Sequence, residues 1–246
     1  MRLTSRRGGV KIVAMACGDD QNPFGPGLLK FLRGLKRNND RAWFVAHKDD
    51  YENELREPAL MFIRIMARHV RRISPHLTAK DTKVGGSLMR IHRDVRFSKS
   101  KLPYKTNVGI QFRHEAGKDV HAPGLYFHVE PGRVFLGCGM WRPDKDALRA
   151  IRVAIVADPA LWRRVRDAKR FREVWDLGGD SLKRAPRGYD QEHPMVEDLR
   201  RMDHIVFCEL PDKVVSDPKL IDTVAGHYRK AAGYLRWQAR SLDLAF

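Results

Sequence analysis

Residues 125–141 read LYFHVEPGRVFLGCGMW, and this stretch decides the fold. Two runs rich in β-branched and aromatic residues flank Pro131 and Gly132, which take the central positions of a tight turn. Strand-forming runs joined by such a turn predict a β-hairpin. We therefore expect one strand to end at Glu130 and the next to begin at Arg133.

The strand pattern extends from this hairpin toward the N-terminus. Residues 107–114 and 87–97 are also rich in β-branched and aromatic side chains, in near-alternation with polar ones. The links between these runs are too short to hold the helical crossovers that parallel strands require. The predicted sheet is therefore mainly antiparallel.

Helical patterns lie on both sides of the strand-rich region. Apolar residues recur at helical spacing in residues 24–36, again from Arg41, and again from Pro58. After the strands they recur in residues 144–155 and 218–242. Helices, then strands, then helices predict one α+β domain, in which N-terminal and C-terminal helices pack on a central, mainly antiparallel sheet.

The first 20 residues stand apart from this domain. Residues 1–20 are basic and lack a helix or strand pattern, so we expect a disordered extension before a single domain at residues 21–246, with Met15 as an alternative start to Met1. The apolar stretch at residues 12–17 is too short for an export signal, and no apolar run reaches the roughly 20 residues of a membrane span. Three scattered cysteines without a Cys-x-x-Cys pair indicate reduced thiols. We expect a cytoplasmic protein without membrane contacts.

The charge of the chain is large and unevenly distributed. Its 246 residues include 47 Lys and Arg against 30 Asp and Glu, which gives a net charge of +17. Residues 1–37 carry 8 basic and 2 acidic groups, and residues 81–105 carry 7 and 2, whereas the part from Pro143 onward is nearly balanced. A concentration of this kind favours a polyanionic or phosphorylated partner.

The second basic stretch contains the candidate binding site. If residues 87–97 form a strand, alternate side chains share one face, and this face carries four ionisable groups in a row. A basic turn follows directly, and guanidinium and ammonium groups on a turn are typical of phosphate or carboxylate recognition. We expect the aromatic ring of Tyr104 to cover the ligand. The predicted ligand-binding residues are Arg90, Arg93, Arg96, Ser98, Lys99, Lys101, Tyr104 and Lys105, with His128 from the hairpin.

Two histidines lie near carboxylates at the same spacing. His92 and Asp94 are two residues apart on the predicted strand face, and His128 and Glu130 repeat that spacing. An imidazole beside a carboxylate can transfer protons near neutral pH, so His92 and Asp94 are the candidate catalytic pair. These four residues would hold a metal only if the two strands adjoined, and no compact metal-ligand spacing is present, so we expect no metal and no cofactor. The sequence leaves enzyme activity open.

Several motifs, in this order along the chain, resemble a known family. They are residues 38–44 (NNDRAWF) with Lys48 and Tyr51, residues 93–105 (RDVRFSKSKLPYK), residues 137–141 (GCGMW) and residues 182–190 (LKRAPRGYD). The combination is similar to the family catalogued as domain of unknown function 2461, and the similarity extends from Phe24 to the C-terminus. The resemblance implies one compact domain with helices and strands, and it assigns no activity. The family usually has an acid between the two lysines, where this chain has Ser100.

Three interpretations of the basic stretch remain open. The leading one is a pocket for a small phosphate-bearing or otherwise anionic ligand, whose binding the single substitution Arg96→Ala should abolish and salt should affect far less. The alternative is a nucleic-acid-binding module, which should lose affinity steeply with salt. The third is a structural or interaction protein, in which Arg93→Ala would lower the melting temperature without changing any binding. The expected partner is therefore an anionic small molecule or a nucleic acid.

Overall fold

The centre of the structure is a six-stranded sheet. The computed structural model describes residues 20–96, 99–117 and 122–246, so nearly all of the predicted N-terminal extension lies outside the described residues. The strands are ordered β1-β2-β3-β4-β6-β5, and every neighbouring pair is antiparallel. This confirms the predicted α+β fold with a mainly antiparallel sheet. The strands are β1 (Leu77–Thr78), β2 (Val108–His114), β3 (Gly124–Glu130), β4 (Arg133–Met140), β5 (Asp176–Gly178) and β6 (His204–Leu210).

The hairpin expected from the sequence joins β3 to β4. Glu130 lies opposite Arg133, as the turn sequence predicts. Gly132 has a φ of +85°, a backbone conformation that side-chain-bearing residues rarely adopt. Its N–H donates to the Asp212 carboxylate at 2.9 Å, which ties the turn to the C-terminal part of the chain. The turn chemistry therefore fixes the register of the two central strands.

Helices precede and follow the strands as predicted. Asp40 and Asp144 begin two of them, because each carboxylate accepts a hydrogen bond from a backbone N–H of the first turn. The N-terminal helices are α1 (Gly27–Arg37), α2 (Arg41–Ala46), α3 (Lys48–Asp50), the π-helical turn η1 (Tyr51–Arg56) and α4 (Glu57–Ile73). The later ones are α5 (Lys145–Ala157), α6 (Pro159–Arg166), α7 (Lys169–Arg172), α8 (Val196–Leu199), the 3-10 helix η2 (Asp212–Ser216) and α9 (Leu220–Ser241).

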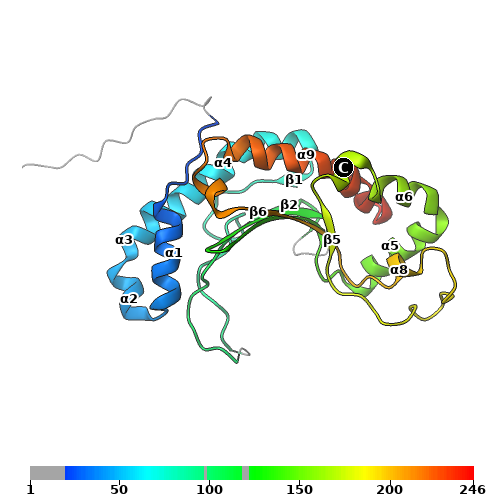
Figure 1. Ribbon diagram of the computed structural model, residues 1–246, viewed down its shortest axis with the longest axis horizontal. Helices are drawn as coiled ribbons and strands as arrows, with labels where there is room; N and C mark the ends of the chain where they lie inside the picture. The colour runs from blue at the N-terminus through cyan, green and yellow to red at the C-terminus, as the bar shows by residue number, and fades with distance from the viewer. Residues whose placement is uncertain (1–19, 97–98, 118–121) are drawn as a thin grey trace, which may run out of the picture.

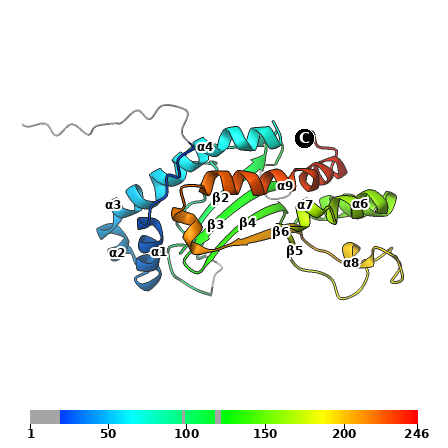
Figure 2. The same ribbon diagram turned by 45° about the horizontal axis from the view of Figure 1, so that its top comes forward.

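Helices α4 and α9 lie side by side on one face of the sheet (Figures 1 and 2). Apolar side chains fill the space between the two layers. The ring of Phe62 from α4 lies 5.1 Å from that of Phe127 on β3, and Phe112 of β2 meets Tyr228 of α9 edge-on at 6.4 Å. The helices α1 to α3 stand at one end of the strands, and α5, α6 and α8 stand at the other. Among the described helices, none combines the length and apolar character needed to cross a membrane.

Candidate functional site

The described parts of residues 87–109 form an arm that leaves the edge of the sheet and returns into the start of β2. Its outgoing and returning segments run antiparallel and are joined by backbone hydrogen bonds. The N–H of Arg93 donates to the carbonyl of Pro103 at 2.9 Å, and the N–H of Lys105 donates to that of Ile91 at 2.8 Å. In Figure 1 the arm extends away from the sheet on the side opposite α4 and α9. The basic stretch is thus presented on a protruding element.

The arm differs from the regular strand expected at residues 87–97. The described part of this stretch makes only two isolated bridges, Leu88 with Ile110 and His92 with Tyr104. Between the bridges the outgoing segment has three residues and the returning segment has five. This mismatch interrupts the ladder, as a bulge does, and explains why no regular strand forms. Phe97 itself lies outside the described residues.

The alternation of exposed and covered side chains nevertheless follows the sequence pattern. Arg90, His92, Asp94 and Arg96 are all exposed, whereas Ile91 between them is 6% exposed. Extended backbone turns successive side chains to opposite sides even where no ladder forms. The ionisable groups therefore share the solvent-facing side of the arm.

Tyr104 anchors the base of the arm and does not face a ligand. Its N–H donates to Oδ1 of Asn39 and its carbonyl accepts from Nδ2 of Asn39, both at 3.0 Å. Its ring stacks on Phe44 at 4.1 Å and is 5% exposed. We expected Tyr104 to cover a ligand, but its ring is buried against the helices. The hydrogen bonds from Asn39 hold the Tyr104 backbone there.

Asp94 is paired with Arg96 and not with His92. Arg96 Nε and one of its terminal nitrogens donate to the two Asp94 carboxylate oxygens at 3.0 and 2.7 Å. These hydrogen bonds hold the pKa of Asp94 below its usual value. His92 instead lies near the rings of Tyr104 and Phe44, with centroids 5.2 and 6.1 Å away. The predicted catalytic pair is therefore not joined by a hydrogen bond within the described residues.

The tip of the arm closes on itself through two further contacts. Arg93 donates to the hydroxyl of Ser100 at 3.3 Å, and the Lys101 ammonium donates to the Val95 carbonyl at 3.1 Å. Ser100 accepts this hydrogen bond without supplying negative charge. Ser98, also predicted to bind the ligand, lies outside the described residues.

Two cations adjoin at the root of the arm. Lys105 is partly buried, and burial together with the positive charge of Arg90 lowers the pKa of its ammonium group. Neither side chain makes a hydrogen bond or ion pair with another residue in the described ranges, and the same holds for Lys99 at the tip. Arg90 also lies close enough to Asp94 for its positive charge to help lower the pKa of that carboxyl, so the root of the arm is not wholly without negative charge.

His128 belongs to a network beside this root. Its Nδ1 lies 3.0 Å from the hydroxyl of Tyr126, and its Nε2 lies 3.7 Å from Glu130. Burial lowers the pKa of His128. Glu130 also accepts a hydrogen bond from Thr106 at 3.1 Å and pairs with Lys36 at 3.6 Å. The network joins the arm to β3 and α1, and the sequence gives no local signal for the parts played by Tyr126 and Thr106.

Among their described residues, the network and the arm hold no arrangement suited to a metal. His128 lies opposite Gly109, whereas His92 lies opposite Tyr104, so the two His-carboxylate pairs do not adjoin. In the part of the chain that the structure describes, no group of three or more His, Cys, Asp or Glu side chains is placed to hold a metal ion. What the arm offers is a set of basic side chains, six of them in residues 87–109.

A sequence profile of a family described as conserved hypothetical protein (DUF2461) matches residues 27–237. The chain belongs to this family. No curated protein matches the chain at a significant level. Two of the DUF2461-like motifs, residues 38–44 and 93–105, meet in space, because Asn39 and Phe44 of the first hold Tyr104 of the second. These two stretches therefore build the base of the arm together.

Proposed function

We propose that this DUF2461 protein binds a nucleic-acid strand along the arm through phosphate neutralisation. The observation that carries the proposal is the charge of the arm. Residues 87–109 contain six basic side chains against a single acid, Asp94. A series of cations along one protruding element can neutralise several phosphates of a strand at once.

The placement of the cations favours an extended ligand over a small one. Small-molecule sites enclose most of the ligand surface in a concave pocket. The cations of the arm are instead spread from its root at Arg90 to its tip at Lys99, and Arg96 has a side chain that is 76% exposed. Two hollows elsewhere in the described structure, one along α4 and one beside the start of α5, include none of these cations in their lining.

The proposal is tested by the fluorescence anisotropy of a short labelled RNA strand. We expect the logarithm of the affinity to fall linearly with the logarithm of the KCl concentration, by about 0.7 for each phosphate neutralised. The double variant Arg90→Glu/Lys105→Glu should weaken binding at least about tenfold and flatten the salt dependence by about 1 to 2. Both results follow from the loss of phosphate contacts at the root.

The matched control carries the same change of charge elsewhere. Arg164 of α6 and Arg170 of α7 are exposed, and the variant Arg164→Glu/Arg170→Glu should weaken RNA binding less than about threefold. Equal losses in the two variants would mean that only net charge matters. Displacement of the RNA by micromolar inorganic phosphate, with little dependence on salt, would instead indicate a small-ligand pocket. If the parent protein does not bind the RNA, and Arg90→Glu/Lys105→Glu lowers the melting temperature, the arm is a structural element.

A further inference from the structure

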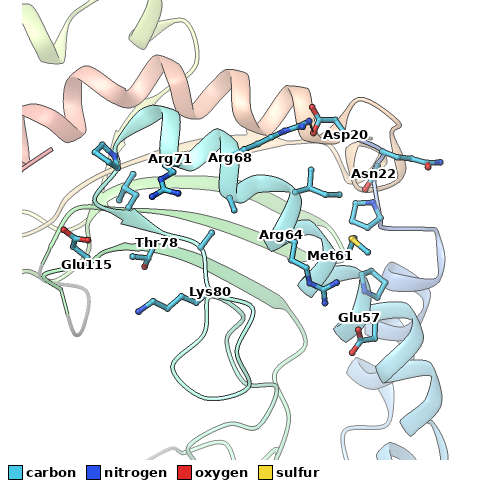
Figure 3. A pocket seen from close by; sticks show the side chains of 18 of the residues that line it. Asp20, Asn22, Glu57, Met61, Arg64, Arg68, Arg71, Thr78, Lys80 and Glu115 are labelled. Carbon is cyan, nitrogen blue, oxygen red and sulfur yellow. Dashed lines mark ion pairs between the residues drawn. The ribbon is translucent and has the colours of Figure 1, made fainter. Parts of the chain in front are cut away.

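A groove lies along the outer face of α4, on a different part of the molecule from the arm. It has a volume of about 1320 Å³, which is above the roughly 300–1,000 Å³ of common ligand pockets. Figure 3 shows α4 crossing between the chain near Asn22 and the segment that carries Thr78 and Lys80. We call this hollow the α4 groove; it is lined by parts of residues 20–23, 57–71 and 75–80, with Asn53 and Glu115. None of the cations of the arm lines it.

Part of the lining of the α4 groove is apolar. Met61 and Ile65 lie one helical turn apart and line the groove together with Ala79. All three side chains are only partly buried, whereas their neighbours Phe62 and Ile63 point into the core and are fully buried. Helix α4 therefore has a second apolar strip, which an apolar ligand would remove from water.

Most charged groups of the groove are already paired. Arg64 donates to Asp81 at 2.8 Å, and Arg68 forms an ion pair with Asp20. Of the two other acids in the lining, Glu57 pairs with Arg56 at 2.9 Å, and Glu115 with His76 at 2.6 Å. Each acid of the lining therefore already has a basic partner within the protein.

Two cations that line the groove have no partner among the described residues. Arg71 and Lys80 make no side-chain hydrogen bond or ion pair with any residue in the described ranges. In Figure 3, Arg71 extends from α4 toward the segment of Thr78 and Lys80. Both cations line the same hollow as Met61 and Ile65. The groove therefore combines apolar surface with positive charge that has no counter-ion.

We propose that the α4 groove binds a single-chain amphipathic anion, in which an unbranched apolar chain ends in a carboxylate or phosphate. The apolar chain lies over Met61 and Ile65, and the head group is held between Arg71 and Lys80. An inorganic anion would leave the apolar strip exposed, and a neutral lipid would leave the two cations without a partner. Only a ligand with both parts satisfies both features of the lining.

The test is a titration of the full-length protein with dansyl-undecanoic acid, whose fluorescence rises when it leaves water. We expect saturable binding that palmitate or lysophosphatidic acid displaces, and the better competitor identifies the head group. Cetyl alcohol, with the same chain as palmitate but no charge, should displace the probe at least about tenfold less well, because it cannot pair with the cations. The variant Arg71→Glu/Lys80→Glu should weaken probe binding by a similar factor.

Two controls separate this site from the arm. Arg90→Glu/Lys105→Glu and Arg164→Glu/Arg170→Glu carry the same change of charge and should leave probe binding within about twofold of the parent. Arg71→Gln/Lys80→Gln should weaken the probe less than the reversal does, and circular dichroism checks that all four proteins are folded. Equal displacement by cetyl alcohol and palmitate, unchanged binding in the Arg71/Lys80 variants, or no saturable binding would overturn the proposal.

Discussion

His204 on β6 is a fully buried imidazole in an apolar setting. Neither ring nitrogen has a hydrogen-bond partner in the described structure, and the ring of Trp162 meets it edge-on at 6.3 Å. Burial, together with the positive charges of Arg201 and Arg152, lowers the pKa of His204 to about 3. The native protein therefore keeps this ring neutral at pH values where the unfolded chain protonates it.

This lowered pKa predicts a loss of stability in mild acid. Below a pH of about 6.5 the His204 imidazole is protonated in the unfolded chain but stays neutral in the native protein. The free energy of unfolding therefore falls as the pH drops toward 3. Between pH 7 and pH 5 the loss due to His204 is about 2 kcal/mol. Urea unfolding at the two pH values measures it. In His204→Phe the difference between the two pH values should shrink by about that amount, whatever the stability at pH 7; an unchanged difference would contradict the account.

At the scale of elements, the arm depends on the loop between α1 and α2. Asn39 satisfies both the N–H and the carbonyl of Tyr104, so Asn39→Ala leaves two backbone groups without partners. We expect a loss of about 1–3 kcal/mol in the free energy of unfolding and faster tryptic cleavage within residues 87–109. The neighbouring variant Asn38→Ala is the control, because the side chain of Asn38 bonds only the carbonyl of Gly34 in α1 among the described residues. Cleavage of the arm at equal rates in both variants would show that Asn39 is not its anchor.

The sequence predicts those helices and turns that are determined by residues close together in the chain. Pro58 marks the first turn of α4, and Gly132 supplies the backbone conformation of the β3–β4 turn. Strand β6 is not predicted, because its place between β4 and β5 depends on pairing with segments far away in the chain. The alternation at residues 90–96 correctly predicts which side chains are exposed. The contact of Asn39 with Tyr104 joins residues that no local pattern relates.

The partners of the charged residues in the α4 groove are even harder to predict from the sequence. Arg64, Arg68 and Arg71 recur at helical spacing. This pattern alone indicates the solvent-exposed side of a helix. The structure distinguishes them, since the first two have internal partners in Asp81 and Asp20. Tertiary contacts therefore decide which of the three cations lacks a partner among the described residues.

At the scale of the whole molecule, the two halves of the chain complete one sheet and one core. Strand β4 pairs with β6 over seven residues, from Val134 opposite Leu210 to Met140 opposite His204. Helix α9 has eleven of its 22 residues buried and lies beside α4 over the same face of the sheet. The N-terminal half thus depends on the C-terminal half for one neighbour of β4 and for half of its helical cover.

A fragment that ends after β4 should consequently not fold. Residues 20–142 would leave the edge of β4 unpaired and expose the apolar side chains beneath α9, so we expect a poorly dispersed NMR spectrum and no cooperative unfolding transition. The full chain should unfold in a single step, with one midpoint by far-ultraviolet circular dichroism and by tryptophan fluorescence. Fluorescence samples both halves, because Trp43 lies in α2 while Trp162 and Trp237 lie in α6 and α9. A folded fragment, or separate midpoints from the two probes, would mean that the halves are independent folding units.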